Sequence, residues 1–575
     1  MQSLPIWYTP RRGYDIRLLR VAPGLDSQPL EIFSYSRKII SEPHYEAISY
    51  TQSGISKRIR LNFWTAKVDQ AIYECFLELR ENRRRPLLWA DPFNFGLYGP
   101  SEIYYNTRIR PFSYMNASRT HFWVGIPLPE KASKSIELLR NMKQQLGLSY
   151  ASNMGLDPYR SREKVSVRQL VMMRSLAPLM SRQHWESLEN TFSFEFFTRM
   201  STIAELVYSR HPFIRFQSIE IPWDQFVAPF DLLAFYYPYC TPDLRAMKVL
   251  HIVEYLRRRF HFPHSAPLDP HEILLVLKSC CREADDPRDL VISVYAITAH
   301  AESASQDALN GIDYSLSIKE LFRMTALRLG LLCFSVSGKS EDLPSWVPDW
   351  RITSNVFPLN HKESTFHASP HEKGERFSAN GDTLQCEALL VDVIQRTSGF
   401  LPSRRDCDHY NASSGNAVVF DEWFTFAEEH SKRNVPKDDV LLEYIDTIQA
   451  RGCNHRWEPT EPESPRFRIE QARKFLDFLR MENAKETLGV KLFFAACLPS
   501  HGRKFGVTRS GHFCLVPRDT QNGDYVCIPH GSKVPVIWRR VSDLYANIGE
   551  CYVHGLMHGE VRSLISVPEQ IFQLA

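Results

Sequence analysis

Two short segments hold a cysteine and a histidine two positions apart, and these are side chains that bind zinc. The pairs are Cys407 with His409 and Cys453 with His455. Together they would supply the four ligands of a tetrahedral site. The spacing within each pair is tighter than in the usual zinc fingers, and none of the twelve cysteines forms a Cys-x-x-Cys pair. We therefore expect no metal here, but reduced, buried thiols of the kind found in the cytosol.

The last part of the chain gathers side chains whose types suit a metal ion: Glu550, His554, His558 and Glu560. Their order differs from His-Glu-x-x-His, in which a helix aligns two histidines on one face. Glycines at 555 and 559 interrupt any such helix. With the glycine at 549, they are typical of turns and close packing in a β hairpin. We expect no metal and no required cofactor.

The motifs of the commonest nucleotide-binding and hydrolytic enzymes are absent from the sequence. There is no GxxxxGK[ST] loop, no GxGxxG after a strand, no GxSxG elbow and no kinase set. These absences exclude large enzyme classes for a chain of 575 residues. They leave open an enzyme of another kind.

Composition and charge are those of an ordinary globular protein with two to four domains. Hydrophobic residues make up 43%, and 69 basic residues against 66 acidic ones leave a net charge of +3. Such a balance argues against a protein that coats nucleic acid. No apolar stretch suits a signal peptide or a membrane helix. We expect a cytoplasmic protein that binds neither nucleic acid nor membrane.

The N-terminal part alternates between short apolar runs and an amphipathic helix. The helix is expected at 68–80, where apolar residues recur at i, i+3, i+4 and i+7. The strands are expected at 16–21, 30–35, 45–50, 86–91 and 121–126. This order predicts a parallel α/β sheet. Ligands of such sheets bind beyond the carboxyl ends of the strands, where Tyr50 and Asp91 would meet.

Helical patterns dominate the middle of the chain and β patterns its end. Helices are expected at 135–146, 165–182, 194–210, 244–260, 270–281, 286–299 and 318–329. Residues 355–382 are polar and read as a linker, short strands are expected at 384–394, and the chain from 506 onward predicts strands broken by glycines. The segment LPSWVPDW at 343–350 is expected to anchor packing through Trp346 and Trp350.

Several segments, in this order along about 550 residues, together resemble fungal heterokaryon incompatibility (HET) domain proteins. They are YEAISYTQSG, LLWADPFNFG with Glu102, FFTRMSTIAEL, DPRDLVISVYAI, LPSWVPDW, GVTRSGHFCLVP and IGECYVHGLMHGEV. The first domain departs from the family pattern. A tryptophan of the family is Gln52 here, its C-I-N-Q tetrad is replaced at 94–97, and its W-x-x-Q before the final glutamate has Ser201 and Ala204. The resemblance thus implies a divergent HET domain.

The resemblance sets the expected domains and fold class. We expect a TIR-like parallel-sheet HET domain, a mainly helical middle region and a small β-rich C-terminal region, hence an α/β protein. The ranges are 1–44 for an N-terminal β segment packing on the HET domain, 45–210 for the HET domain, 211–354 for the helical region, 355–382 for the linker, 383–505 for a mixed α/β region and 506–575 for the β-rich end.

The function implied by the resemblance is fungal non-self recognition, with growth arrest and cell death after unlike cells fuse. Some TIR domains cleave NAD with a glutamate that follows a tryptophan in a helix, and Glu205 matches that position. A carboxylate there can stabilise an oxocarbenium-like state. Asp91 and Glu102 are candidate second carboxylates, and Tyr50 is a candidate for binding NAD as substrate. Each acid also has a structural interpretation: Asp91 as a cap, Glu102 as a solvated loop residue, and Glu205 as a partner of Arg199 or Arg210.

Three functions follow as hypotheses. The first is cell-death signalling through contacts with other HET or incompatibility proteins. The second is a NAD glycohydrolase that uses Glu205, and the third is an inactive scaffold or decoy. The sequence leaves the partner, the oligomeric state and the activity of the divergent domain open.

Overall fold

The computed structural model describes most of the chain. The described residues are 15–25, 27–38, 44–51, 53–80, 86–90, 110–145, 183–184, 187, 190–191, 195–217, 219–227, 245–261, 274, 284, 286–301, 315–329, 340, 342–352, 356–360, 364–370, 377–402, 415–431, 435–453, 464–481, 493–494, 496–563 and 569–575. The chain divides into two compact units. The first comprises Met1–Asp269 and Cys280–Ser315, and the second comprises Pro270–Ser279 and Leu316–Ala575.

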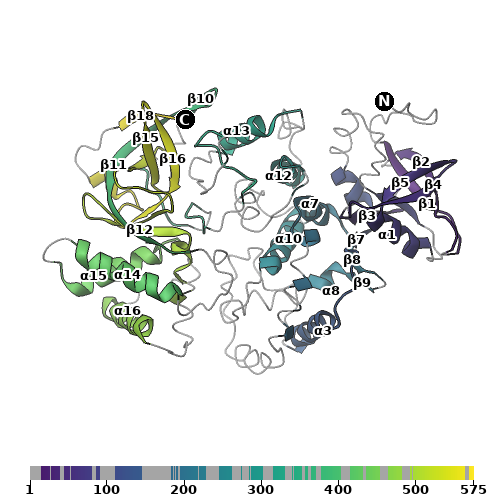
Figure 1. Cartoon of the computed structure of the whole chain (residues 1–575), viewed down its shortest axis with the longest axis horizontal. Coiled ribbons are helices and arrows are strands. Elements are labelled where there is room, and N and C mark those ends of the chain that lie inside the picture. The colour runs from purple at the N-terminus through teal and green to yellow at the C-terminus, as the bar shows by residue number, and fades with distance from the viewer. Residues whose placement is uncertain are drawn as a thin grey trace. The chain divides into compact units, whose positions relative to one another are not determined.

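The first unit is built on a nine-stranded sheet (Figure 1). Its strands lie in the order β5-β4-β2-β1-β6-β3-β7-β8-β9. Their bounds are β1 Asp15–Val21, β2 Glu31–Lys38, β3 Tyr45–Tyr50, β4 Ser56–Leu61, β5 Trp64–Asp69, β6 Leu87–Ala90, β7 Arg119–Trp123, β8 Pro212–Phe216 and β9 Ile219–Pro222.

The predicted parallel sheet is right for the centre and wrong for the flanks. Strands β6, β3, β7 and β8 are parallel neighbours. The pairs β1–β2, β1–β6, β4–β5 and β8–β9 are antiparallel. Strands β4 and β5 are joined by two residues, as are β8 and β9, and so short a connection permits only antiparallel pairing. The sheet is therefore mixed, and the first two strands are part of it.

Helix α1, Gln70–Arg80, covers one face of this sheet and begins two residues later than predicted, because 68–69 complete β5. Its buried side chains include Ile72, Cys75, Phe76 and Leu79, the stripe expected from the apolar spacing. They join one core cluster with strand residues such as Ile48, Ile59 and Trp123. This cluster fixes which face of each strand points to α1.

The other helices of the first unit follow the predicted order. They are α3 Glu130–Gln145, α6 Glu195–Thr198, α7 Met200–Tyr208, α8 Trp223–Val227, α10 Arg245–His261 and α12 Asp289–Ala301. The helix expected at 194–210 is split in two, because Arg199 has extended backbone angles, with φ −74° and ψ 135°. The helices expected at 165–182 and 270–281 lie outside the described residues, apart from position 274.

The second unit contains a closed β-barrel. Its strands are β10 Phe377–Asn380, β11 Thr383–Phe400, β12 Arg503–Thr508, β13 Phe513–Pro517, β14 Tyr525–Pro529, β15 Val536–Val541, β16 Leu544–Glu550, β17 Tyr552–Val553 and β18 Glu569–Leu574. Hydrogen bonding runs β14-β15-β16-β18-β11, and β11 also pairs with β14, which closes the ring. β11 continues into a second layer with β12, β13 and β17.

The long strand β11 differs from the short strands predicted at 384–394. It runs for 18 residues, because register shifts after Leu390 and after Ile394 bend it from one set of partners to the next. The β pattern predicted from 506 onward is confirmed. The predicted linker 355–382 is irregular at 356–360 and 364–370, but β10 occupies its end.

Helices α14 Gly415–His430, α15 Lys437–Ile448 and α16 Pro465–Arg480 lie together beside the barrel (Figure 1). α16 begins where Ser464 caps the amide of Phe467 and Pro465 stands at the first helical position. Helix α13, Ile318–Leu329, packs Phe322 edge-on against Trp350 at 4.9 Å. Trp346 is fully buried and donates to the Asp382 carbonyl. The predicted role of both tryptophans in packing is confirmed.

Candidate functional site

Glu205, the candidate catalytic acid, lies in α7 with its carboxylate directed at the sheet. The Ser49 hydroxyl donates a hydrogen bond to Glu205 Oε2 at 2.5 Å. Glu205 is 7% exposed and Ser49 is buried. Since Ser49 is the penultimate residue of β3, the contact lies at the carboxyl end of a parallel strand. That edge is where α/β sheets bind ligands.

The backbone around Glu205 is held by capping contacts at the end of α7. Ser209 donates from its amide and its hydroxyl to the Glu205 carbonyl, at 3.0 and 2.8 Å. Arg257 of α10 donates to the Ser209 carbonyl at 2.6 Å. His261, on the same helix, contacts the Val207 carbonyl at 2.9 Å. The last carbonyls of a helix lack partners within the helix and need such donors. These contacts therefore fix the backbone position of Glu205.

Burial and the neighbouring Arg257 charge lower the pKa of His261 to about 4, although its backbone hydrogen bonds oppose the shift. The ring is therefore neutral near pH 7. It packs edge-on against Phe260, at 5.1 Å between ring centroids. His261 thus serves the end of α7 as a neutral, packed ring.

Of the other three candidate residues, the structure describes Tyr50, and it is not brought to Glu205. Tyr50 packs against the core cluster that contains the α1 side chains. Its neighbour Ser49 contacts Glu205, and successive strand residues point to opposite faces. Tyr50 and Glu205 therefore belong to different faces of the sheet. Asp91 and Glu102 lie outside the described residues.

A buried charge network, which the sequence reasoning missed, lies across β3, β7, β8 and β9. His121 Nε2 is 2.7 Å from Glu46 Oε2, and His121 Nδ1 is 3.3 Å from Glu220 Oε2. Arg119 donates to Glu220, and Arg215 Nε lies 2.9 Å from Glu220 Oε2. The signal was in the sequence, because Glu46 and His121 interrupt two apolar runs predicted as strands.

The two carboxyl groups of this network are held ionised. Burial raises the pKa of Glu220, but the contact with His121 and the charges of His121, Arg215 and Arg119 outweigh it and lower the pKa to about 2. Burial also opposes ionisation of Glu46, whose pKa is lowered by the hydrogen bond and charge of His121. Paired in this way, the two carboxylates can stabilise the sheet, and neither carries a proton near neutral pH.

The second unit has its own buried ion pair. Arg503 Nη2 donates to Glu550 Oε1 at 2.7 Å, and both side chains are buried. The Glu550 carboxylate also accepts from the amides of Leu359 and Asn360, at 2.7 and 3.2 Å. Arg503 donates further to the Pro499 carbonyl at 2.7 Å. Glu550, considered above for metal binding, is therefore a structural partner that ties β16 to β12.

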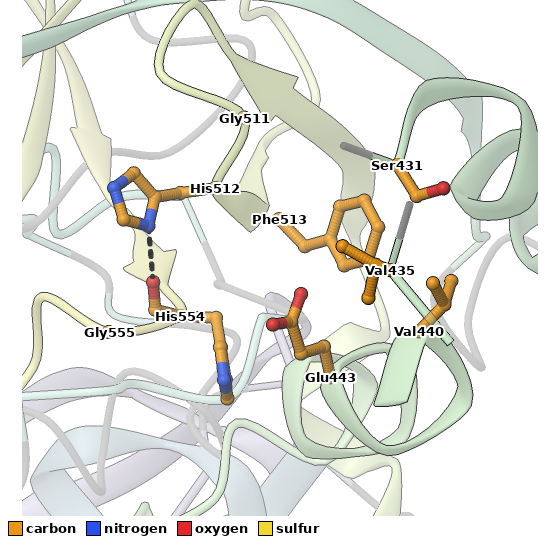
Figure 2. Close-up of a pocket in the computed structure, with 9 residues that line it drawn as sticks. All are labelled: Ser431, Val435, Val440, Glu443, Gly511, His512, Phe513, His554 and Gly555. Atoms are coloured by element: carbon orange, nitrogen blue, oxygen red, sulfur yellow. Dashed lines mark hydrogen bonds between the residues drawn. The ribbon is translucent and has the colours of Figure 1, made fainter. Parts of the chain in front are cut away.

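A cavity of about 220 Å³ lies between α15, the end of α14, the turn before β13 and the turn after β17 (Figure 2). Glu443 directs its carboxylate into the space between Phe513 and the two histidines, His512 and His554. His512 Nδ1 lies 3.1 Å from the His554 carbonyl. The lining consists of Ser431, Val435, Val440, Glu443, Gly511, His512, Phe513, His554 and Gly555. The cavity is smaller than the roughly 300–1,000 Å³ typical of ligand sites.

Of the residues weighed as metal ligands, Glu550 pairs with Arg503 and His554 lines the cavity. Among the described residues, no three histidines, cysteines or acids lie close enough to hold a metal ion. Gly555 and Gly559 each have φ +81°, the left-handed conformation of the predicted turns. Cys453 is buried and reduced, as is every described cysteine: Cys75, Cys386, Cys453, Cys497, Cys514, Cys527 and Cys551. Cys407, His409 and His455 lie outside the described residues.

No helix in the described part of the chain is long and apolar enough to cross a membrane. No curated protein and no solved structure matches this chain. One match was found to a family model, and it lies in the second unit, outside residues 45–210. It spans α14 to α16 and the barrel strands from β12 to β17. Residues 412–568 match the Het-6 beta-barrel domain, a HET-related domain of fungal heterokaryon incompatibility proteins.

Proposed function

We propose that this protein acts in fungal heterokaryon incompatibility, as a cytoplasmic component of cell-death signalling that works through contacts with other incompatibility proteins. The observation that carries the proposal is the match of residues 412–568 to the Het-6 beta-barrel domain. The resemblance of the N-terminal motifs to HET proteins supports a divergent, TIR-like HET domain at 45–210. The parallel strands β6, β3, β7 and β8 are compatible with that fold.

Induced expression in a filamentous fungus tests this role. The full chain is expected to arrest growth and reduce viable colony counts. Glu550→Gln is expected to abolish the effect, because it leaves Arg503 buried without its counter-ion and destabilises the barrel. Glu470→Gln is the matched control, since its carboxylate is exposed on α16 and pairs with the exposed Lys474. Full viability with the intact chain, at protein levels confirmed by immunoblot, contradicts the proposal.

A second candidate function is a NAD glycohydrolase that uses Glu205. It is favoured by one observation, the position of this carboxylate at the carboxyl end of β3 beside Ser49. In such chemistry a carboxylate stabilises the oxocarbenium-like state or holds the ribose hydroxyls.

Nicotinamide release from NAD by the purified full chain tests this candidate. Glu205→Gln keeps the shape and still accepts from Ser49, so it is expected to fold and to lose about 100-fold in rate or more. Glu78→Gln, on the exposed side of α1, is the matched control. Absence of turnover, or equal turnover in the Glu205 and Glu78 variants, removes the candidate.

A further inference from the structure

The hairpin of β4 and β5 lies at the edge of the first sheet and presents a rigid tip. Its two-residue turn consists of Asn62 and Phe63. The Asn62 amide donates to the Ile32 carbonyl at 2.8 Å. Its side chain accepts from the Ser34 amide and donates to the Ser34 hydroxyl, at 2.9 and 3.0 Å. Asn62 tolerates the positive φ of 52° that the turn requires. The tip is therefore fixed to β2.

Two aromatic side chains are exposed at this tip. Phe63 is 94% exposed and Trp64 is 56% exposed. A scattered apolar residue on a surface is ordinary. Here, however, two adjacent aromatic rings stand at a turn that three hydrogen bonds fix to β2, so the fold presents both rings outward. Since they contribute little to the core of this unit, their position calls for contact with something else.

Behind the tip, one face of the hairpin is basic. Arg58 and Arg60 alternate with the buried Ile59 and Leu61, so both point away from the α1 side. Lys67 lies directly opposite Arg58 in the strand register. All three side chains are exposed and form no ion pair within the described part of the chain. With Lys57, the hairpin carries four cations against the single acid Asp69.

The acid and the cations of this hairpin do not neutralise each other. Asp69 accepts from Ser53 and from the amides of Gly54 and Ala71, and so holds the turn before β4. Arg58 and Lys67 are like charges directly opposite each other, an arrangement that destabilises a strand pair. A bound anion between them removes that repulsion. The face is therefore complementary to an anionic surface.

We propose that the β4–β5 hairpin docks on a membrane surface that contains anionic lipids. Phe63 and Trp64 enter the boundary between headgroups and acyl chains, where aromatic rings are favoured. Arg60 and Arg58 lie two and four residues behind the turn, or about 7–14 Å at the rise of a strand. That distance is comparable to the reach of the charge of an anionic leaflet, about 8–10 Å.

A lipid surface fits this hairpin better than a single-stranded nucleic acid. Nucleic acids bind where aromatic rings lie among the cations, so that bases stack while phosphates are neutralised. Here the exposed rings are at the tip and the cations lie behind it on the strands. This order matches the depth order of a membrane interface, with apolar boundary first and charged headgroups above it.

Sedimentation of the full chain with vesicles tests the proposal. The chain is expected to bind vesicles of phosphatidylcholine that contain about a third phosphatidylserine, and to dissociate from them as the salt concentration rises. It is expected not to bind vesicles of pure phosphatidylcholine. The double variant Phe63→Ser/Trp64→Ser is expected to lower the bound-to-free ratio about tenfold. Arg58→Gln/Lys67→Gln is expected to lower it several-fold and to weaken its salt dependence.

A matched control lies on the β15–β16 hairpin, where Arg540 and Val541 are exposed. Arg540→Gln/Val541→Ser removes one cation and one apolar side chain and is expected to bind vesicles like the intact chain. All of these positions are exposed, so equal thermal unfolding of each variant verifies its fold. Unchanged binding in the Phe63/Trp64 variant overturns the proposal. Binding to a polyuridine oligonucleotide without binding to anionic vesicles overturns it equally.

Discussion

Arg503 and Glu550 are opposite charges placed in the interior of the barrel unit. Arg503 is 1% exposed, and its Nη1 and Nη2 groups donate to the carbonyls of Phe357 and Pro499 and to the Glu550 carboxylate. Burial alone disfavours both charges, and the pKa of Arg503 is lowered by it. Mutual attraction and the amides of Leu359 and Asn360 oppose that cost, although burial still leaves the pKa of Glu550 raised. Removing one partner therefore leaves the other as a buried charge without a counter-ion.

Glu550→Gln is predicted to reduce the free energy of unfolding of the second unit by about 3 kcal/mol, because Arg503 keeps its charge without a counter-ion. Denaturant unfolding of the full chain, followed by tryptophan fluorescence, measures the change. Glu470→Gln, at an exposed pair on α16, is expected to stay within about 0.5 kcal/mol of the original chain. Equal stability of the two variants would show that the buried pair contributes nothing.

The network around Glu220 makes the first unit sensitive to acid. The pKa of Glu220 is about 2 in the folded chain against its usual 4.5. A lowered folded pKa means that the unfolded chain takes up the proton first as pH falls. The stabilisation is thus complete above about pH 4.5 and is lost as the pH falls toward 2. Glu46, with its lowered pKa, adds to the same window.

Glu220→Gln is predicted to make the unfolding of this unit less dependent on pH between about 4.5 and 2. The expected difference is about 1–2 kcal/mol after allowance for the partial exposure of the side chain. Circular dichroism during acid titration measures it. An exposed acid on the same unit, Glu78, provides the control variant Glu78→Gln. A pH profile unaltered by Glu220→Gln contradicts the assigned ion pairs.

Sequence reasoning located some candidate residues but not their surroundings. It placed Glu205 on a helix and Tyr50 at the end of a strand, and both are there. It did not show that Ser49, rather than Tyr50, faces Glu205. The face on which a strand residue lies depends on which side each helix packs, and α1 and α7 are far apart from one another in sequence. The buried network depends in the same way on β3, β7, β8 and β9 becoming neighbours.

At the scale of elements, patterns along the chain predicted type well and pairing less well. The apolar spacing of α1 is local, so it could be predicted directly from the sequence. The parallel centre followed from strand–helix alternation. The antiparallel flanks and the course of β11 depend on bulges and on distant partners, which alternation of apolar residues does not encode.

Two glycines of the second unit allow the steric cost of an added methyl group to be compared with the cost of the backbone conformation. Gly502 and Gly523 both have positive φ, +78° and +93°. A Cβ at Gly502 would lie 2.7 Å from Val356 Cγ2, whereas a Cβ at Gly523 meets nothing within 4 Å. Both positions disfavour alanine through the left-handed backbone, at about 1–2 kcal/mol. Only Gly502 adds a steric cost.

Gly502→Ala is predicted to destabilise the second unit by about 1–3 kcal/mol more than Gly523→Ala, because Val356 has to move. Thermal or denaturant unfolding of the two single variants gives the difference directly. Equal losses would mean that the turn before β12 relaxes freely around the added methyl group.

At the scale of the whole molecule, the described residues form two units, and different observations bear on the function of each. The second carries the Het-6 beta-barrel match, and its interior is fixed by a buried ion pair and by the closed strand ring. The first has a mixed sheet with a rigid, basic and aromatic hairpin at its edge. That hairpin is the basis of the proposed lipid contact, whereas the sequence predicted no membrane contact. The reason is that exposure is a property of the folded surface and not of the local pattern.

Viable counts after induced expression test most directly the proposal that the chain promotes fungal cell death through protein contacts that need its barrel. The intact chain and Glu205→Gln are predicted to reduce viability equally, and Glu550→Gln is predicted to leave it near that of uninduced cells. Full viability with the intact chain contradicts the claim. Loss of killing in Glu205→Gln, with the protein folded and present, would instead assign the activity to catalysis at Glu205.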